Sequence, residues 1–196
     1  MHVIGLHGAA GSGKSTIARF LVQHYGCVPV AFADPFKQRA VALHGAPIAE
    51  VYGLAPKSLA VREFLQLEGT ERGRDVHGPD VWVHHALAHL YRLDQLGVTR
   101  VVIDDVRFLN EADALRGRVR GPGWQMRAFM GGRCFTGEVW GIRGRGGIPG
   151  NHASERPLPD AALDWLLQNG GDLGATRTIV QSYVGARLGW EPTLWA

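Results

Sequence analysis

Cysteine, lysine and long apolar runs are scarce in this sequence, and each shortage excludes a class of protein. The two cysteines, Cys27 and Cys134, have neither the spacing of a metal site nor the density of a disulfide framework. No apolar run is long enough to span a bilayer, so a membrane is not an expected partner. The net charge of only +3 does not indicate a nucleic-acid polymer as partner. We therefore expect a cytoplasmic protein with reduced thiols.

Arginine supplies most of the positive charge, because Lys14, Lys37 and Lys57 are the only lysines. The planar guanidinium group suits the recognition of phosphates. An apolar content of 45% is ordinary for a folded protein, and 196 residues are enough for one domain with a sizeable core. We therefore expect a single domain over residues 1–196.

Short apolar runs alternate with helical patterns along the chain, which predicts an α/β fold built on a parallel sheet. The predicted strands are residues 3–7, 27–32, 101–103, 125–130 and 162–167. The predicted helices are residues 14–25, 35–43, 58–73, 81–96, 111–116 and 173–188. Residues 131–150 are rich in glycine, and we interpret them as a mobile segment.

A phosphate-binding motif joins the first predicted strand to the first predicted helix. Residues 8–15, GAAGSGKS, match the P-loop pattern G-x-x-x-x-G-K-[ST]. Its glycines let backbone N–H groups approach a polyphosphate without interference from a Cβ atom. The N-terminus of the following helix attracts the same anion. Lys14 adds a mobile charge for the outer phosphates, and the Ser15 hydroxyl can bind Mg²⁺. The motif therefore predicts a nucleotide site.

Acidic residues follow the buried apolar run 101–103, where Asp104 and Asp105 stand next to each other. An acid at the end of a buried parallel strand can face the P-loop and hold Mg²⁺ directly or through water. The pattern alone makes the two aspartates equal candidates. A second polar cluster lies within residues 62–82, where a phosphate acceptor could bind.

Several strings outside the P-loop carry a further signal. They are residues 62–66 (REFLQ), 69–71 (GTE), 73–75 (GRD), 78–83 (GPDVWV), 105–111 (DVRFLNE), 152–155 (HASE) and 168–170 (QNG). The patterns G-T-E-x-G-R and D-V-R-F-x-N-E are far more specific than the P-loop. In these strings the sequence resembles the phage deoxynucleoside monophosphate kinases. The resemblance implies a three-layer P-loop kinase fold, with a five-stranded parallel sheet flanked by helices and a small lid. It implies transfer of the ATP γ-phosphoryl group to a deoxynucleoside 5′-monophosphate, with Mg²⁺ as cofactor and a homodimer as the assembly.

The resemblance also implies roles for individual residues. The ATP phosphates and Mg²⁺ would be held by Gly8, Gly11, Ser12, Gly13, Lys14, Ser15 and Thr16. The acceptor would be bound by Asp34, Lys37, Arg62, Gly69, Thr70, Arg74, Trp82, Arg107 and Glu111. The catalytic residues would be Lys14, Asp105 and Arg107, and the metal would be held by Ser15 and Asp105. Independently of the resemblance, we add Arg143 and Arg145 as catalytic candidates of the lid, because their glycine neighbours could permit closure over the site. Asp105 is preferred to Asp104 because it matches the acid of the family. Residues 53–97 would form a helical acceptor region, and residues 131–155 the lid.

Two other functions stay open from the sequence. Residues 34–37, DPFK, are equally compatible with a kinase that resembles dephospho-coenzyme A kinase. A P-loop also occurs in nucleotide-dependent switches without transferase activity, which need no second phosphate site. The strings within residues 62–82 favour a nucleotide kinase over both.

We predict that Lys14→Ala abolishes phosphoryl transfer and leaves the protein folded, because the ammonium group neutralises charge on the transferring phosphate. The expected loss is at least on the order of 10²–10³-fold in kcat. An ATP-coupled assay measures the loss, and a thermal melt by circular dichroism checks the fold. Undiminished turnover by the purified variant would remove the P-loop from the mechanism.

Overall fold

The computed structural model describes residues 1–117, 135–144, 156–170 and 172–193, and these fall into two compact units. The first unit consists of Met1–Val30 and Tyr91–Ala196, and the second of Ala31–Leu90. We call them the sheet unit and the helical unit. Among the described residues, no helix combines the length and the apolar character needed to cross a bilayer.

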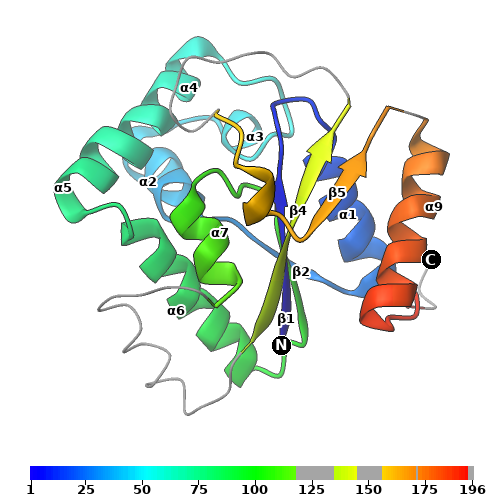
Figure 1. Ribbon diagram of the computed structural model, residues 1–196. Coiled ribbons are helices and arrows are strands. Elements are labelled where there is room, and N and C mark those ends of the chain that lie inside the picture. The colour runs from blue at the N-terminus through cyan, green and yellow to red at the C-terminus, as the bar shows by residue number, and fades with distance from the viewer. Residues whose placement is uncertain (118–134, 145–155, 171, 194–196) are drawn as a thin grey trace. The chain divides into compact units, whose positions relative to one another are not determined.

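The sheet unit is built on five parallel strands in the order β2-β3-β1-β4-β5 (Figure 1). The strands are β1 (His2–His7), β2 (Val28–Val30), β3 (Arg100–Ile103), β4 (Thr136–Arg143) and β5 (Trp165–Gln168). The central strand, β1, pairs with β3 on one side and with β4 on the other. The predicted α/β fold with a five-stranded parallel sheet is confirmed.

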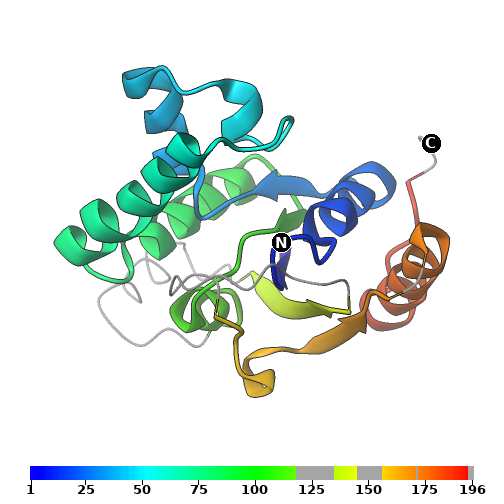
Figure 2. The same ribbon diagram turned by 90° about the horizontal axis from the view of Figure 1, so that it is seen from above.

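Helices cover both faces of this sheet, so the sheet unit has three layers. Figure 2 shows α1 (Lys14–Tyr25) and α9 (Leu173–Tyr183) on one face and α7 (Leu109–Leu115) on the other. Side chains alternate along β1. Ile4 and Leu6 join the core under α1 and α9, while Gly5 lies against Leu115 of α7. Two shorter elements complete the unit, namely η3 (Asp160–Ala162) before β5 and η4 (Val184–Leu188) after α9.

The position of β4 corrects the sequence prediction. The strand predicted at residues 125–130 lies outside the described residues, and the described strand runs through the stretch that we interpreted as mobile. Two glycines of β4 are required by close packing. A Cβ atom at Gly137 would collide with the carbonyl oxygen of Leu115, and one at Gly141 would lie 2.6 Å from a methyl group of Leu163. Glycine within a strand therefore marks close packing here and no break in the sheet.

The helical unit contains the predicted helices between the second and third strands. They are α2 (Asp34–His44), α3 (Ile48–Val51), α4 (Leu59–Gln66), the π-helical η1 (Leu67–Arg74), α5 (Asp75–His77) and α6 (Val81–Gln95). The helical unit ends at Leu90, so the last residues of α6 belong to the sheet unit. Its own small core is formed by Ala40, Val51 and Val61. The predictions of helix over residues 58–73 and 81–96 are confirmed.

A buried carboxyl group lies on the sheet face that α9 covers. Glu138 of β4 is 7% exposed, and its Oε1 accepts a hydrogen bond of 2.8 Å from Trp140 Nε1. Burial raises the pKa of Glu138, and the Trp140 hydrogen bond offsets only part of that effect. Because the pKa is higher in the folded state, ionisation of Glu138 destabilises the fold as the pH rises above its unfolded value of about 4.3.

We predict that Glu138→Gln stabilises the protein at pH 7–8, since glutamine keeps an acceptor for Trp140 and removes the buried charge. Each kcal/mol recovered should raise Tm by about 2–4 °C, and the gain should vanish near pH 4. Thermal melts from pH 4 to pH 8 measure it, with the exposed Glu63→Gln as the matched control. An equal Tm for Glu138→Gln and wild type across that range would contradict the prediction.

Candidate active site

The P-loop connects β1 to α1 at the carboxyl edge of the sheet, where parallel α/β proteins bind their ligands. Two of its glycines have no room for a side chain. A Cβ atom at Gly8 would lie 2.5 Å from the carbonyl oxygen of Ile142, and one at Gly13 would collide with the amide nitrogen of Asn169. Gly13 also has a positive φ of 101° at the start of α1. Both positions therefore require glycine, as a loop that wraps closely around an anion does.

Lys14 is folded back onto the P-loop. Its Nζ donates hydrogen bonds to the carbonyl oxygens of Gly8, at 2.6 Å, and Ala9, at 2.7 Å. Burial lowers the pKa of Lys14 to about 8, the positive charge of Arg107 contributes, and the carboxylates of Asp104 and Asp105 oppose the shift. The ammonium group is thus held where positive charge is costly, and a bound anion would relieve that cost.

The hydroxyl group of Ser15 faces an acid at the end of β3. Ser15 Oγ donates a hydrogen bond of 2.8 Å to Asp104 Oδ2. Oxygen ligands of this kind are those that Mg²⁺ prefers. The hydroxyl of Ser12 is buried and has no hydrogen-bond partner among the described residues, as expected of a group that meets a ligand. The residues present therefore fit Mg²⁺ and phosphate, and they bring Asp104 to Ser15. The assignment of Asp105 to the metal stays a prediction.

Positive side chains from three segments converge on the same edge. Lys14, Arg107 and Arg143 each lower the pKa of His7, the last residue of β1, in addition to the larger effect of its burial. Arg143 ends β4 and forms an ion pair with Asp160. Three of the predicted catalytic residues are thus near one point. The third arginine candidate, Arg145, lies outside the described residues.

Glu111 has a different environment from the one that the sequence suggested. Its side chain is buried, and Oε2 accepts hydrogen bonds from the backbone N–H groups of Arg107, at 2.7 Å, and Phe108, at 3.0 Å. Glu111 therefore orders the loop between β3 and α7. Its predicted contact with the acceptor is not among these interactions and stays a prediction.

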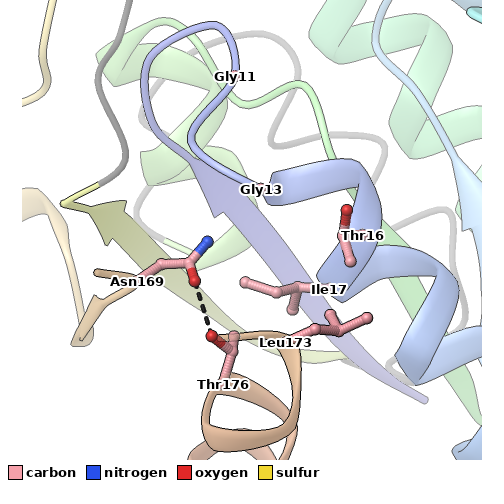
Figure 3. Close-up of a pocket in the computed structure, with 7 residues that line it drawn as sticks. All are labelled: Gly11, Gly13, Thr16, Ile17, Asn169, Leu173 and Thr176. Atoms are coloured by element: carbon pink, nitrogen blue, oxygen red, sulfur yellow. Dashed lines mark hydrogen bonds between the residues drawn. The ribbon is translucent and has the colours of Figure 1, made fainter. Parts of the chain in front are cut away.

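A small pocket of about 120 Å³ opens beside the P-loop (Figure 3). It is lined by Gly11, Gly13, Thr16, Ile17, Asn169, Leu173 and Thr176. Asn169 is buried; its amide Nδ2 donates to the carbonyl of Ser12, and its Oδ1 accepts from Thr176 Oγ1, both at 2.7 Å. The motif search missed Asn169 as a site residue, although it belongs to the string 168–170. Its partner Ser12 is 157 residues away in sequence, and no local pattern reveals such a contact.

The remaining predicted residues belong to the helical unit. Trp82 is buried; its Nε1 donates a hydrogen bond of 2.7 Å to the carbonyl of Gly69, and its ring meets that of Phe36 edge to face at 5.0 Å. Trp82 therefore supports the π-helical segment η1 from inside. Arg62 is exposed on α4, Thr70 is half-buried in η1, and Arg74 donates to the carbonyl of Pro79.

Asp34 and Lys37, the other two acceptor candidates, lie close together at the start of α2. Lys37 Nζ is 3.9 Å from Asp34 Oδ1, and Asp34 Oδ2 accepts a hydrogen bond of 2.8 Å from the backbone of Ala31. Among the described residues, no three His, Cys, Asp or Glu side chains gather into a metal-binding group. His85 and His89 have the helical spacing of a zinc pair, but they belong to no such group of three.

Comparison with known proteins finds similar kinases. The chain is 32% identical to a putative deoxynucleotide monophosphate kinase of Acanthamoeba polyphaga mimivirus over 136 residues, which are 59% of this chain and 69% of that one. It is 52% identical to a dephospho-CoA kinase of Synechococcus sp. (strain JA-2-3B'a(2-13)) over 50 residues, which are 26% of this chain and 20% of that enzyme. A sugar kinase structure from Janibacter sp. HTCC2649 aligns over 96% of both chains, with a TM-score of 0.48 and 15% identity. No family model matches the sequence.

We predict that ATP binding at pH 8 is accompanied by proton uptake. The phosphates should raise the pKa of Lys14 from about 8, so a group that is half protonated before binding becomes fully charged, with an uptake of about half a proton. Isothermal titration calorimetry in Tris and in HEPES measures this as a buffer-dependent enthalpy. Lys14→Arg, which is always charged, is the control and should show no uptake from this position. Proton release, or an enthalpy independent of buffer in the wild type, would contradict the prediction.

Proposed function

This chain belongs to the deoxynucleotide monophosphate kinases, the family of its mimivirus relative, and on that premise we propose that it transfers the γ-phosphoryl group of ATP to a deoxynucleoside 5′-monophosphate. The coarser statement, that the chain is a P-loop kinase acting on a nucleotide or another small molecule, follows from the same relatives. The proposal adds the identity of the acceptor.

The observation that carries the proposal is the convergence of Lys14, Arg107 and Arg143 around the end of β1. A site that only bound one nucleotide would need the P-loop lysine. Two further arginines that act on the same histidine, His7, suit the transfer of a phosphoryl group between two phosphate chains, where negative charge from both substrates must be neutralised. The strings GTE and GRD of the helical unit support a nucleotide as the acceptor, because they carry the resemblance stated above.

The reaction needs no general base. The acceptor is a phosphate oxygen, and a phosphate monoester is largely dianionic near neutral pH because its second pKa is about 6. This oxygen forms a new bond to the γ-phosphorus while the bond to the β,γ-bridging oxygen breaks, and ADP leaves with that electron pair. The protein contributes position and charge: the P-loop orients the donor, and Lys14, Arg107 and Arg143 neutralise the transferring group.

The metal site that we propose consists of Ser15 with Asp104, and Asp105 is the alternative ligand. Mg²⁺ prefers oxygen ligands of this kind. The hydrogen bond between Ser15 and Asp104 shows that their two oxygens lie close together. When bound, Mg²⁺ neutralises charge on the β- and γ-phosphates. The carboxylates of both aspartates also balance the positive charge of Lys14 in the absence of substrate.

The pocket beside the P-loop is our proposed site for the donor nucleoside. It adjoins the glycines that would hold the phosphates, and Ile17 and Leu173 give it an apolar wall (Figure 3). Asn169 and Thr176 place polar groups at its edge. An apolar wall with a few polar groups is typical of a site for a small molecule or cofactor, and a nucleoside belongs to that class.

A kinase acting on dephospho-coenzyme A is the second candidate, because 50 residues match such an enzyme with 52% identity. The atom that accepts the phosphoryl group in that substrate is a ribose hydroxyl oxygen, and its proton has to be removed by a general base. A nucleoside monophosphate offers a phosphate oxygen instead. The two acceptors therefore make different demands on one site, and a direct comparison decides between them.

We predict that purified protein with Mg²⁺ and ATP forms ADP only when a deoxynucleoside monophosphate is added, with the deoxynucleoside diphosphate as the second product. The assay compares the four deoxynucleoside monophosphates, the four ribonucleoside monophosphates and dephospho-coenzyme A, with Lys14→Ala as the background. If dephospho-coenzyme A were the one acceptor of the panel that stimulates ADP formation, the result would favour the second candidate. ADP formation that no acceptor stimulates would refute both.

A further inference from the structure

One peptide group in the loop after β3 is held at both ends by buried side chains. The carbonyl oxygen of Val106 accepts a hydrogen bond of 2.9 Å from His7 Nδ1. The N–H of Arg107, on the other side of the same peptide bond, donates to Glu111 Oε2 at 2.7 Å. Because the peptide group is planar, two contacts in opposite directions fix its orientation. The direction in which the Arg107 side chain leaves the backbone is thereby restricted.

The partners of His7 determine which ring nitrogen carries the proton. His7 Nε2 lies 3.0 Å from the backbone N–H of Leu158, which can only donate, so Nε2 must accept. The carbonyl of Val106 can only accept, so Nδ1 must donate. The ring is therefore neutral and carries its proton on Nδ1. A protonated Nε2 would lose the contact with Leu158.

The surroundings of His7 keep the ring in this neutral form. Burial lowers the pKa of His7, and the positive charges of Lys14, Arg143 and Arg107 lower it further, while the hydrogen bond to Val106 opposes them. These cations reach His7 from α1, β4 and the loop after β3. A fourth positive charge among three cations would be unfavourable, so the geometry and the electrostatics agree on a neutral ring.

We propose that His7 is a positioning residue for phosphoryl transfer: together with Glu111 it clamps the Val106–Arg107 peptide and directs Arg107 toward the P-loop. The proposal rests on the proposed function. It gives Glu111 a role through the backbone, and it gives His7 a role that no motif assigns. It also connects the segment around Leu158, which precedes β5, to the same clamp.

The tautomer of His7 tests the clamp without any activity measurement. Protein labelled with ¹⁵N-histidine, without substrates, is studied by long-range ¹H–¹⁵N NMR, and the signal of His7 is assigned as the one missing in His7→Gln. We expect a neutral ring with the proton on Nδ1 at pH 7–8. A ring protonated on Nε2, or doubly protonated at pH 7, would overturn the proposal.

A kinetic test separates positioning from general support of the fold. We expect His7→Leu, which removes both hydrogen bonds, to lower kcat on the order of 10–100-fold, as a small misplacement of a catalytic group does. The KM for ATP should change little. His7→Gln can restore a donor and an acceptor, and should recover most of the rate. His84→Leu, at an exposed histidine of α6, is the matched control and should keep the wild-type rate.

A double-mutant cycle links the effect to Arg107. Arg107→Ala should cost on the order of 10²–10³-fold in kcat, the loss typical of one preorganised donor. If His7 acts through Arg107, adding His7→Leu to Arg107→Ala should cost little more. The same fold-loss in both backgrounds would overturn the proposal. Should His7→Leu unfold below the assay temperature, the cycle is run with His7→Gln, whose loss must then also disappear in the Arg107→Ala background.

Failure of the proposed function is recognisable separately. A wild-type protein that phosphorylates no nucleotide would refute the function, and the NMR experiment would still decide whether His7 holds the peptide. A kinase in which His7→Leu keeps the full rate would leave the function intact and would overturn the positioning role.

Discussion

The parallel pairing of β1 with both β3 and β4 is the constraint on which the rest of the structure depends. It brings the ends of three strands to one edge of the sheet, although Gly8, Asp104 and Arg143 are far apart in sequence. The P-loop continues β1 at this edge, the acids follow β3, and an arginine ends β4. The P-loop packs closely against β4, because a side chain at Gly8 would collide with the backbone of Ile142.

Lys14, Arg107 and Arg143 contribute positive charge at this edge of the sheet. Partial burial lowers the pKa of the half-buried Lys14, the positive charge of Arg107 lowers it further, and the two aspartates oppose the shift only in part. A desolvated cation costs free energy in the unliganded protein, and phosphate groups would recover that free energy on binding. Burial and the same cations also lower the pKa of His7, which favours the neutral form of the ring. Buried polar groups such as His7, Glu111 and Asn169 then hold the loops through hydrogen bonds to the backbone.

Much of the fold could be predicted from the sequence, because its signals are local. The glycine pattern before Lys14, the apolar run 101–103 and the helix that ends at Gly26 all depend on neighbouring residues. The strand β4 could not, because Gly137 and Gly141 look like a flexible segment and are in fact required by packing against Leu115 and Leu163.

The site was harder to predict because its contacts also join residues that are far apart in sequence. The residue pattern left Asp104 and Asp105 equal and the family resemblance favoured Asp105, whereas the structure brings Asp104 to Ser15. The resemblance implied that Trp82 lines the acceptor site, and in the structure its buried side chain contacts Gly69 and Phe36. The partners of His7 are 99 and 151 residues away, so its role depends on contacts that exist only in the folded chain.

The central claim is that the phosphates of the donor and of the acceptor meet at the cations beside β1. A crystal structure with ADP, a deoxynucleoside monophosphate, Mg²⁺ and aluminium fluoride, which mimics the transferring phosphoryl group, tests it most directly. We expect the fluoride ligands within hydrogen-bond distance of Lys14 Nζ and of the Arg107 guanidinium, between the two nucleotides. A mimic bound away from Lys14, or an acceptor whose phosphate does not face the donor, would contradict the account.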